Sequence, residues 1–256
     1  MKQKLLLEHL SWPEIKQDLE DGFFRVIIPV ASMEQHGYHL PENTDTVLGE
    51  ACALMVAEKL GKTLVAPVIR PGISPHHMRL PGTVTLRMET FRMLVRDYVD
   101  CYIHHGFTEI VFLAAHGGNV KPCEEVTAEV LSDPEIQKSG VKLFTVKDIP
   151  SPEELRELER IHGLPVGTNG GHADERETSE MLSVVPELVT MEKAAKGWCD
   201  PLTPELLEQF FTQGVTSLTE VGSIGDPRYA TAERGLWYRE TAASALAKEI
   251  LEKSKD

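Results

Sequence analysis

The chain has 256 residues, of which 41% are hydrophobic and 26% charged. These proportions are ordinary for a soluble globular protein, and the length predicts one domain over residues 1–256 with a large core. The formal net charge of −14 argues against a nucleic-acid partner, because there is no basic stripe to neutralise phosphates. It argues equally against an anionic membrane surface.

Four scattered cysteines form no C-x-x-C pair and are expected to be reduced, buried thiols: Cys52, Cys101, Cys123 and Cys199. The N-terminal apolar patch is interrupted at Glu8, so it lacks the core of a signal peptide. No apolar run approaches the length of a membrane span. We therefore expect a cytoplasmic protein with no membrane partner.

The first half of the chain alternates helical and extended patterns. The pattern predicts, in order, a helix that starts near Ser11, a strand over 23–32, a helix from Asp45 to Leu60, a strand over 64–69 and a helix over 88–106. Residues 70–87 are rich in proline and glycine and are expected to form a long loop. Loops of that length are often functional.

The second half continues the alternation. It predicts, in order, a strand from 109 that runs into a His-Gly-Gly turn, a helix over 122–132, a strand over 141–149, a helix from 151, a glycine-rich turn with a short helix from about 174, and a helix over 231–253. Residues 195–228 have mixed polarity and give no clear pattern. Strands that alternate with helices predict a three-layer α/β/α fold with a mostly parallel central sheet.

Three ligand-type side chains follow the first predicted strand: Glu34, His36 and Asp45. If that strand continues to His36, Glu34 and His36 share one face of it. A carboxylate and an imidazole on one face, followed by a second carboxylate, suit a divalent metal ion. The alternative is a polar strand exit that leads into a helix N-cap.

A histidine also ends the third predicted strand, at His116-Gly117-Gly118. Sites in open α/β sheets form beyond the carboxyl ends of the strands, so His116 is expected near the first cluster, and this favours the metal hypothesis. Gly117 and Gly118 expose backbone N–H groups that could hold an oxyanion, although a tight turn also requires glycine. His39 has no partner at its own spacing and is interpreted as a loop residue.

A third cluster surrounds the start of the predicted helix near residue 174. His172 lies at the mouth of this helix and is a candidate acid or base, and Glu177 lies one turn into the helix. Asp174 and Glu175 have a simpler interpretation, because acidic residues favour the first helical turn. We expect His172 and Glu177 to be catalytic.

Three motifs, MEQHGYHLPENTD, AAHGGN and GHADERETSEML, follow one another in this order. Together they resemble the creatininase (creatinine amidohydrolase) family from about residue 23 to 190, and less clearly over 225–235. The resemblance implies a binuclear metal amidohydrolase, commonly a hexamer. It implies metal ligands at five positions, with Asp45 as the bridge: Glu34, His36, Asp45, His116 and Glu177.

The resemblance also places His172 near the substrate and His77 in the pocket wall, and we assign Gly117, Gly118 and Asn119 to substrate binding as well. True creatininases resemble one another at a His-Tyr-Glu-Asn turn, whose glutamate binds metal. This chain has Gly118 there, which argues against creatinine as substrate. Imidazole and carboxylate ligands suit two ions of zinc, manganese or iron. Glu175 remains the alternative to Glu177 as the last ligand.

The expected reaction is metal-dependent hydrolysis of a non-peptide C–N bond in a small or cyclic amide or formamide. Other branches of the family are similar in motif: deformylases of flavin and deazaflavin biosynthesis, a peptide-trimming enzyme of mycofactocin maturation, and a hydrolase of inositol-derived keto sugars. The alternatives are therefore hydrolysis of a C–C bond in a keto sugar, or a non-catalytic metal-binding subunit. The expected partners are a small-molecule substrate and further copies of the chain.

Overall fold

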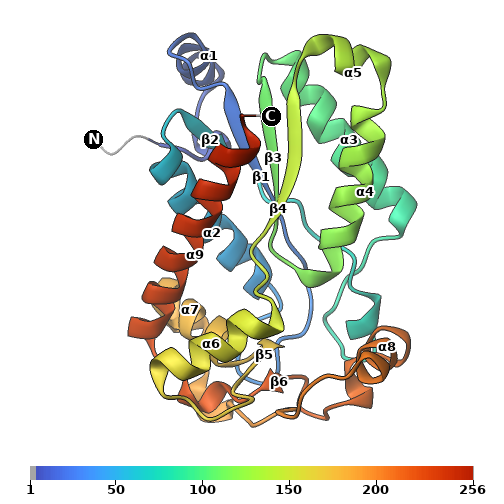
Figure 1. The fold of residues 1–256 in the computed structure, drawn as a ribbon, viewed down its shortest axis with the longest axis vertical. Helices are drawn as coiled ribbons and strands as arrows, with labels where there is room; N and C mark the ends of the chain where they lie inside the picture. Colours follow the sequence, from blue (N-terminus) through green and yellow to red (C-terminus); the bar gives the residue numbers. More distant parts are fainter. Residues whose placement is uncertain (1–3, 256) are drawn as a thin grey trace.

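The computed structural model describes residues 4–255, and its centre is a four-stranded parallel sheet (Figure 1). The strands lie in the order β2-β1-β3-β4, and every neighbouring pair is parallel. Their bounds are β1 Arg25–Val30, β2 Thr63–Val65, β3 Glu109–Ala114 and β4 Lys142–Lys147. β1 and β3 are buried along their whole length, as expected for strands covered on both faces.

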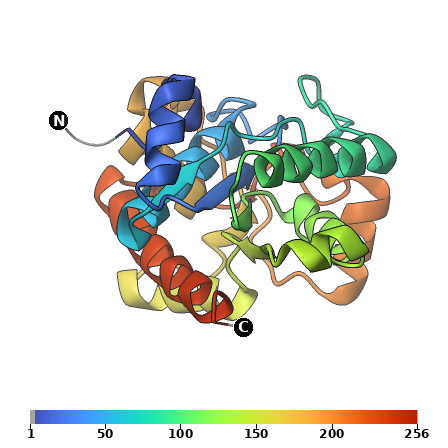
Figure 2. The ribbon, with the colours of Figure 1, turned by 90° about the horizontal axis from the view of Figure 1, so that it is seen from above.

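Helices cover both faces of this sheet (Figures 1 and 2). Their bounds are α1 Trp12–Glu20, α2 Thr44–Leu60, α3 Met88–His104, α4 Val120–Leu131, α5 Pro134–Ser139 and α9 Ala232–Lys253. Val26 and Ile28 of β1 pack into the cluster that holds α3 and α4, whereas Ile27 packs into the cluster that holds α2 and α9. This alternation along one strand confirms the predicted three-layer α/β/α fold.

A second group of elements lies beyond one end of the sheet (Figure 1). It contains a two-stranded antiparallel sheet and three helices: β5 Asn169–His172, β6 Ile224–Gly225, α6 Pro152–His162, α7 Glu175–Val184 and α8 Pro204–Gln213. The carboxyl ends of β1 and β3 face this group, so residues that follow these strands meet side chains from α7 and β5.

Several predicted elements differ from the structure. The strand expected over 64–69 ends at Val65, because Pro67 has no N–H to donate, and Ile69 makes only a single bridge to Val30. The glycine-rich turn before residue 174 contains β5, and the unclear region 195–228 contains α8 and β6. α5 was not predicted, although Asp133 caps it at Glu135 N.

The four cysteines are free thiols, but the expectation that all are buried is wrong. Cys52 and Cys123 are buried, Cys199 is half-buried and Cys101 is exposed on α3. Within residues 4–255, none of the helices combines the length and the apolar character that crossing a membrane requires.

Candidate metal centre

The segment between β1 and α2 contributes three side chains to one buried cluster. β1 stops at Val30, so the idea that Glu34 and His36 share a face of a continuing strand is wrong. They converge because the chain folds back, and Nδ1 of His36 lies 2.9 Å from the carbonyl oxygen of Glu34. Asp45 is the second residue of α2, and its Oδ1 lies 3.1 Å from Nε2 of His36.

His116 joins this cluster from the neighbouring strand. β1 and β3 pair in register up to Val30 and Ala114, so the residues that follow them leave the same edge of the sheet. Nδ1 of His116 lies 3.3 Å from Oε1 of Glu34 and 3.4 Å from Oδ2 of Asp45. The two strand ends therefore meet as the sequence predicts.

Glu177 joins the cluster from α7. Asp174 caps this helix by accepting from the backbone N–H of Glu177, at 3.0 Å, which agrees with its interpretation as a helix-start residue. Oε2 of Glu177 accepts from the backbone N–H of Ala173 and lies 3.7 Å from Nε2 of His36. Glu175 points elsewhere, because its carboxylate binds Ser179, Arg234 and Tyr238.

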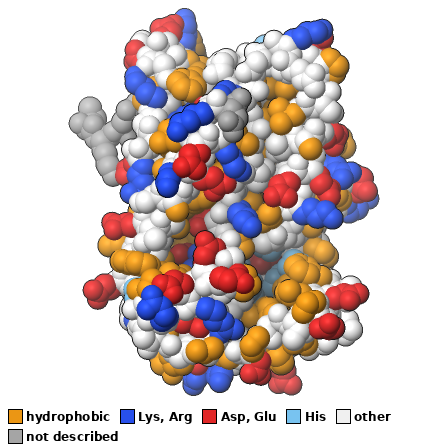
Figure 3. Space-filling view, viewed as in Figure 1, with side chains coloured by type: hydrophobic (Ala, Val, Ile, Leu, Met, Phe, Trp, Pro, Cys, Tyr) orange, Lys and Arg blue, Asp and Glu red, His pale blue; other side chains and the backbone are white. Residues whose placement is uncertain are grey.

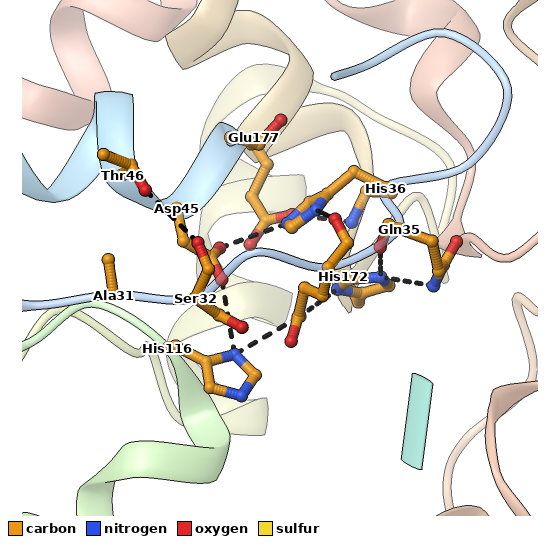
Figure 4. Close-up of polar contacts among 12 residues, drawn as sticks. Ala31, Ser32, Gln35, His36, Asp45, Thr46, His116, His172 and Glu177 are labelled. Carbon is orange, nitrogen blue, oxygen red and sulfur yellow. Dashed lines mark hydrogen bonds and ion pairs between the residues drawn. The ribbon is translucent and has the colours of Figure 1, made fainter. Parts of the chain in front are cut away.

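These side chains form two ligand sets that share one residue (Figure 4). One set is Glu34, Asp45 and His116, and the other is His36, Asp45 and Glu177. Within each set the histidine nitrogen lies 3.1 to 3.7 Å from the carboxylate oxygens, and all ligand atoms lie within 4.8 Å of one another. Ligands of one ion at about 2.1 Å lie roughly 3–3.5 Å from one another, so each set fits a divalent cation.

Both histidines of these sets are oriented as metal ligands usually are. His36 donates from Nδ1 to the carbonyl of Glu34, which leaves Nε2 facing the carboxylates. His116 places Nε2 at 3.1 Å from the carbonyl of Ile73, which leaves Nδ1 facing Glu34 and Asp45. A ring nitrogen bonded to a backbone carbonyl is the common outer contact of a metal-binding histidine.

The carboxylates also have unused acceptor capacity. Glu34 is 1% exposed, and neither of its carboxylate oxygens accepts a hydrogen bond from the described residues. Oδ2 of Asp45 is also buried and accepts no hydrogen bond from the described residues. Buried carboxylate oxygens without donors are costly unless a cation binds them, so these atoms fit the two ions expected from the sequence.

The electrostatics of the cluster favour positive charge. Burial opposes the charged form of His36, but Asp45 and then Glu177 outweigh it and raise the pKa of His36 to about 10. Burial is likewise outweighed at His116, where Glu34 and Asp45 raise the pKa to about 9. The carboxylates thus hold a proton on each of these two histidines, and the same negative potential would attract divalent cations in their place.

Two further histidines predicted from the sequence lie beside these sets. Each also belongs to a possible ligand group with Glu34, His77 together with His76 and His172 together with His36. His77 Nε2 is 3.4 Å and His172 Nδ1 is 3.7 Å from Oε1 of Glu34. Burial lowers the pKa of His77 to about 3 and holds the pKa of His172 well below its ordinary value, so both rings are neutral. They therefore add no positive charge next to the cluster.

Gln35, which the sequence analysis did not single out, connects these two rings. Its Oε1 accepts from the backbone N–H of Gly37, so its Nε2 faces the histidines. That Nε2 lies 2.8 Å from Nδ1 of His77, 2.8 Å from Nε2 of His172 and 3.1 Å from the carbonyl of Gly222.

One assignment of protons satisfies these contacts except the 2.8 Å approach of Gln35 Nε2 to His172 Nε2, where both nitrogens carry hydrogens. Nε2 of His172 also lies 2.9 Å from the backbone carbonyl of Gln35, to which it can donate. The two amide hydrogens of Gln35 then go to His77 Nδ1 and to Gly222. In this arrangement Nδ1 of His172 carries a lone pair and faces the cluster.

A cavity of about 250 Å³ opens onto the cluster and is lined by Glu34, Asp45, His77, His116, His172 and Glu177 among others. Gly117 and Gly118 also line it, in a short 3₁₀ turn after His116. Asn119 does not. Its amide binds the carbonyls of Val30 and Ala31 and the N–H of Ile73, so Asn119 falls outside the proposed substrate site.

The opposite wall of this cavity comes from residues that sequence reasoning missed. His76 is buried, lies parallel to the His116 ring at 5.8 Å between centroids, and contacts Phe210 and Phe211 of α8. In Figure 3, histidine side chains lie in a recess bordered by hydrophobic ones. His76 adjoins His77 in a proline-rich loop, which is the one sequence signal that could have identified it.

His39 lies outside both ligand sets, in agreement with its interpretation as a loop residue. It is nevertheless buried, and its Nε2 lies 2.8 Å from Oγ1 of Thr178. Burial lowers the pKa of His39 to about 4, so the ring is neutral. This contact joins the segment before α2 to α7.

The fold and the cluster together define a metal-dependent hydrolase of the three-layer α/β/α class. The sequence profile described as "Creatininase: Creatinine amidohydrolase" matches residues 8–250. The chain therefore belongs to the creatininase family.

Individual relatives agree with this assignment. The chain is 32% identical to a mycofactocin precursor peptide peptidase of Mycobacterium ulcerans, over 82% of this chain and 78% of the relative. It is 25% identical to the creatinine amidohydrolase of Pseudomonas putida, over 98% of both. A solved structure of a mutant creatininase, described as "Zn-Zn type", superposes with a TM-score of 0.83 at 24% identity, over 98% of this chain and 99% of that one.

Proposed function

We propose that this chain hydrolyses an amide C–N bond with two divalent metal ions that share Asp45 as a ligand. Glu34 and His116 would complete one set of ligands, and His36 and Glu177 the other. The observation that carries the proposal is the presence of Asp45 in two separate groups of ligand atoms. Zinc, manganese and iron all suit these ligands. Solved relatives titled with zinc or manganese support the first two.

Two ions bound in this way would lower the pKa of a shared water molecule and polarise the substrate carbonyl. His172 would take a proton at Nδ1, the nitrogen that its contact with Gln35 leaves unprotonated, and pass it to the leaving nitrogen. Burial raises the pKa of Glu177 to about 7. Glu177 would assist the proton transfer at the same end of α7. The backbone N–H groups of Gly117 and Gly118 would hold the developing oxyanion.

A small or cyclic amide or a formamide is the first substrate class to test. A peptide is the second, because the 32% identical relatives are named peptide peptidases. Hydrolysis of a C–C bond is a third reaction to test, because a 3-dehydro-scyllo-inosose hydrolase of Thermotoga maritima is 30% identical over 66% of this chain. A non-catalytic metal-binding subunit is disfavoured, since a side chain is present for every proposed ligand.

The test is a substrate screen on protein loaded separately with zinc, manganese or iron. Formamides, cyclic amides and short peptides are offered to the wild type and to Asp45→Asn, with Asp97→Asn as the matched control because Asp97 is exposed on α3. We expect turnover that Asp45→Asn reduces by about a thousandfold or more and Asp97→Asn leaves unchanged. Equal turnover in wild type and Asp45→Asn would contradict the proposal.

Assembly and location are also proposals. A homo-oligomer, with a hexamer as the first state to test, follows from the family, and light scattering on the purified protein decides it. Activity in the cytoplasmic fraction of cells that express the chain is the corresponding test of the proposed location.

A further inference from the structure

A second cavity, of about 390 Å³, adjoins the metal cavity. It lies between α6, the residues around β5, and the segment that leads into α8. The two cavities adjoin along a wall of six shared lining residues: Pro152, Leu155, Gly170, Leu202, Leu207 and Ile224. Pockets for drug-sized ligands span about 300–1,000 Å³, so the metal cavity alone is small and the second cavity extends it.

The shared wall and the additional lining are mainly apolar. Trp198 and Pro201 add to the shared leucine and isoleucine side chains. The charged residues of the lining are Arg156, Glu153 and Asp200, one cation and two acids. Arg156 already lies 3.4 Å from the buried carboxylate of Glu159. This mixture favours a neutral, apolar occupant over an anion.

One buried donor in the lining has no acceptor. Asn169 is 3% exposed, and its Oδ1 accepts from the backbone N–H of Arg176. Its Nδ2 has no hydrogen-bond partner among the described residues. A buried amide N–H₂ without an acceptor is costly, and an acceptor that reached this atom would relieve that cost.

We infer that the second cavity binds an apolar group attached to the amide that is hydrolysed. The substrate is then an extended amide, in which one carbonyl lies at the metal ligands and an aliphatic or aromatic group lies between Leu155, Trp198 and Leu202. This inference rests on the proposed amide hydrolysis and specifies its substrate.

Cys199 provides a direct probe, because it lines the second cavity and not the metal cavity. The metal-loaded full chain is treated with N-ethylmaleimide, and the modification of each cysteine is followed by mass spectrometry. Saturating N-acetyl-leucinamide is expected to slow the modification of Cys199 by about fivefold or more, and N-acetyl-glycinamide by less than about twofold. Cys101, exposed on α3, is the internal control and reacts at an unchanged rate. Equal rates at Cys199 with both amides would overturn the inference.

A second measurement separates this inference from the proposed function. The value of kcat/KM is expected to be about tenfold or more higher for amides that carry a leucyl group than for matched glycyl amides. Turnover of both series at equal rates would overturn the apolar subsite and leave amide hydrolysis intact. Protection of Cys199 without turnover of either series would support the subsite and contradict the proposed reaction.

Discussion

Oδ1 of Asp45 lies 3.1 Å from Nε2 of His36, a residue nine positions earlier in the chain. The other oxygen, Oδ2, lies 3.4 Å from Nδ1 of His116. The first contact depends on the turn between β1 and α2, and the second on the pairing of β1 with β3. One carboxylate thus joins two ligand sets that come from different parts of the sheet edge, which is the geometry of a bridging ligand.

Gln35 is expected to control activity without binding metal. Its amide lies 2.8 Å from Nδ1 of His77 and 2.8 Å from Nε2 of His172, and its donation to His77 keeps the proton of that ring on Nε2. We predict that Gln35→Leu lowers kcat/KM by about 10–100-fold and leaves the metal content unchanged. Gln17→Leu is the control, because Gln17 is exposed on α1. Wild-type kcat/KM in Gln35→Leu would show that the contact is dispensable.

Arg176 is expected to be a major source of stability. Its side chain is 7% exposed, lies 3.0 Å from the carboxylate of Glu180 and lies 3.9 Å from that of Glu177. Arg176→Met would leave these buried carboxylates uncompensated, at a cost of about 3–5 kcal/mol in the free energy of unfolding.

The control for Arg176→Met is Arg160→Met. Arg160 is 73% exposed and pairs with Glu157 on the surface of α6. Its replacement is expected to cost less than about 1 kcal/mol. Urea unfolding measures both variants, and similar losses in the two would contradict a special role for Arg176.

Gly118 and Gly117 provide a matched pair for the turn after β3. A Cβ at Gly118 would collide with the carbonyl oxygen of Ile73 and with the His116 ring, whereas a Cβ at Gly117 meets nothing within 4 Å. We predict that Gly118→Ala lowers the free energy of unfolding by about 1–3 kcal/mol and displaces His116, which reduces metal binding. Gly117→Ala should change the stability little. Thermal unfolding and metal content measure both, and equal effects would contradict the packing shown at Gly118.

Metal-free protein is expected to lose stability as the pH rises above about 6.5. The pKa values of His36 and His116 are raised to about 10 and about 9 in the folded chain. A folded pKa above the unfolded value means that the native state holds more protons, so its stabilisation is complete below the unfolded pKa and disappears as the pH passes the folded one.

The expected slope between about pH 6.5 and 9 is a loss of roughly 1–3 kcal/mol per pH unit. Bound metal ions would replace the protons on His36 and His116, so the metal-loaded protein should show a shallower slope. Urea unfolding at several pH values, with and without a chelator, measures this difference. Identical slopes in the two forms would contradict the assignment of these histidines as ligands.

The sequence predicts the parallel sheet and most of its helices because buried β-branched runs and helix caps are local signals. Strands are predicted directly from the apolar runs at Val26 to Ile28 and Glu109 to Ala114. At Glu34 and His36 the chain turns, where the sequence predicts a continuing strand. No local signal marks this turn, because it depends on contacts with α2 and β3. The two residues meet for a different reason from the one predicted.

The apolar wall of the cleft could not be predicted from the sequence. Phe210 and Trp198 lie in a segment of mixed polarity. Their role appears only when α8 packs against the loop that carries His76 and Trp198 pairs with Ile224 of β6. Gln35 was missed for a similar reason, since its importance depends on His172, which is 137 residues away. Asn119 is predicted from the sequence among the substrate residues, together with Gly117 and Gly118, but its hydrogen bonds turn it toward β1.

Metal content per chain in wild type, Asp45→Asn and Asp97→Asn tests the bridged centre most directly. The account predicts about two ions per chain in the wild type and in Asp97→Asn, and loss of both in Asp45→Asn, because each set needs the shared carboxylate. Two ions retained in Asp45→Asn, or one ion lost and the other bound as tightly as before, would contradict Asp45 as the bridge.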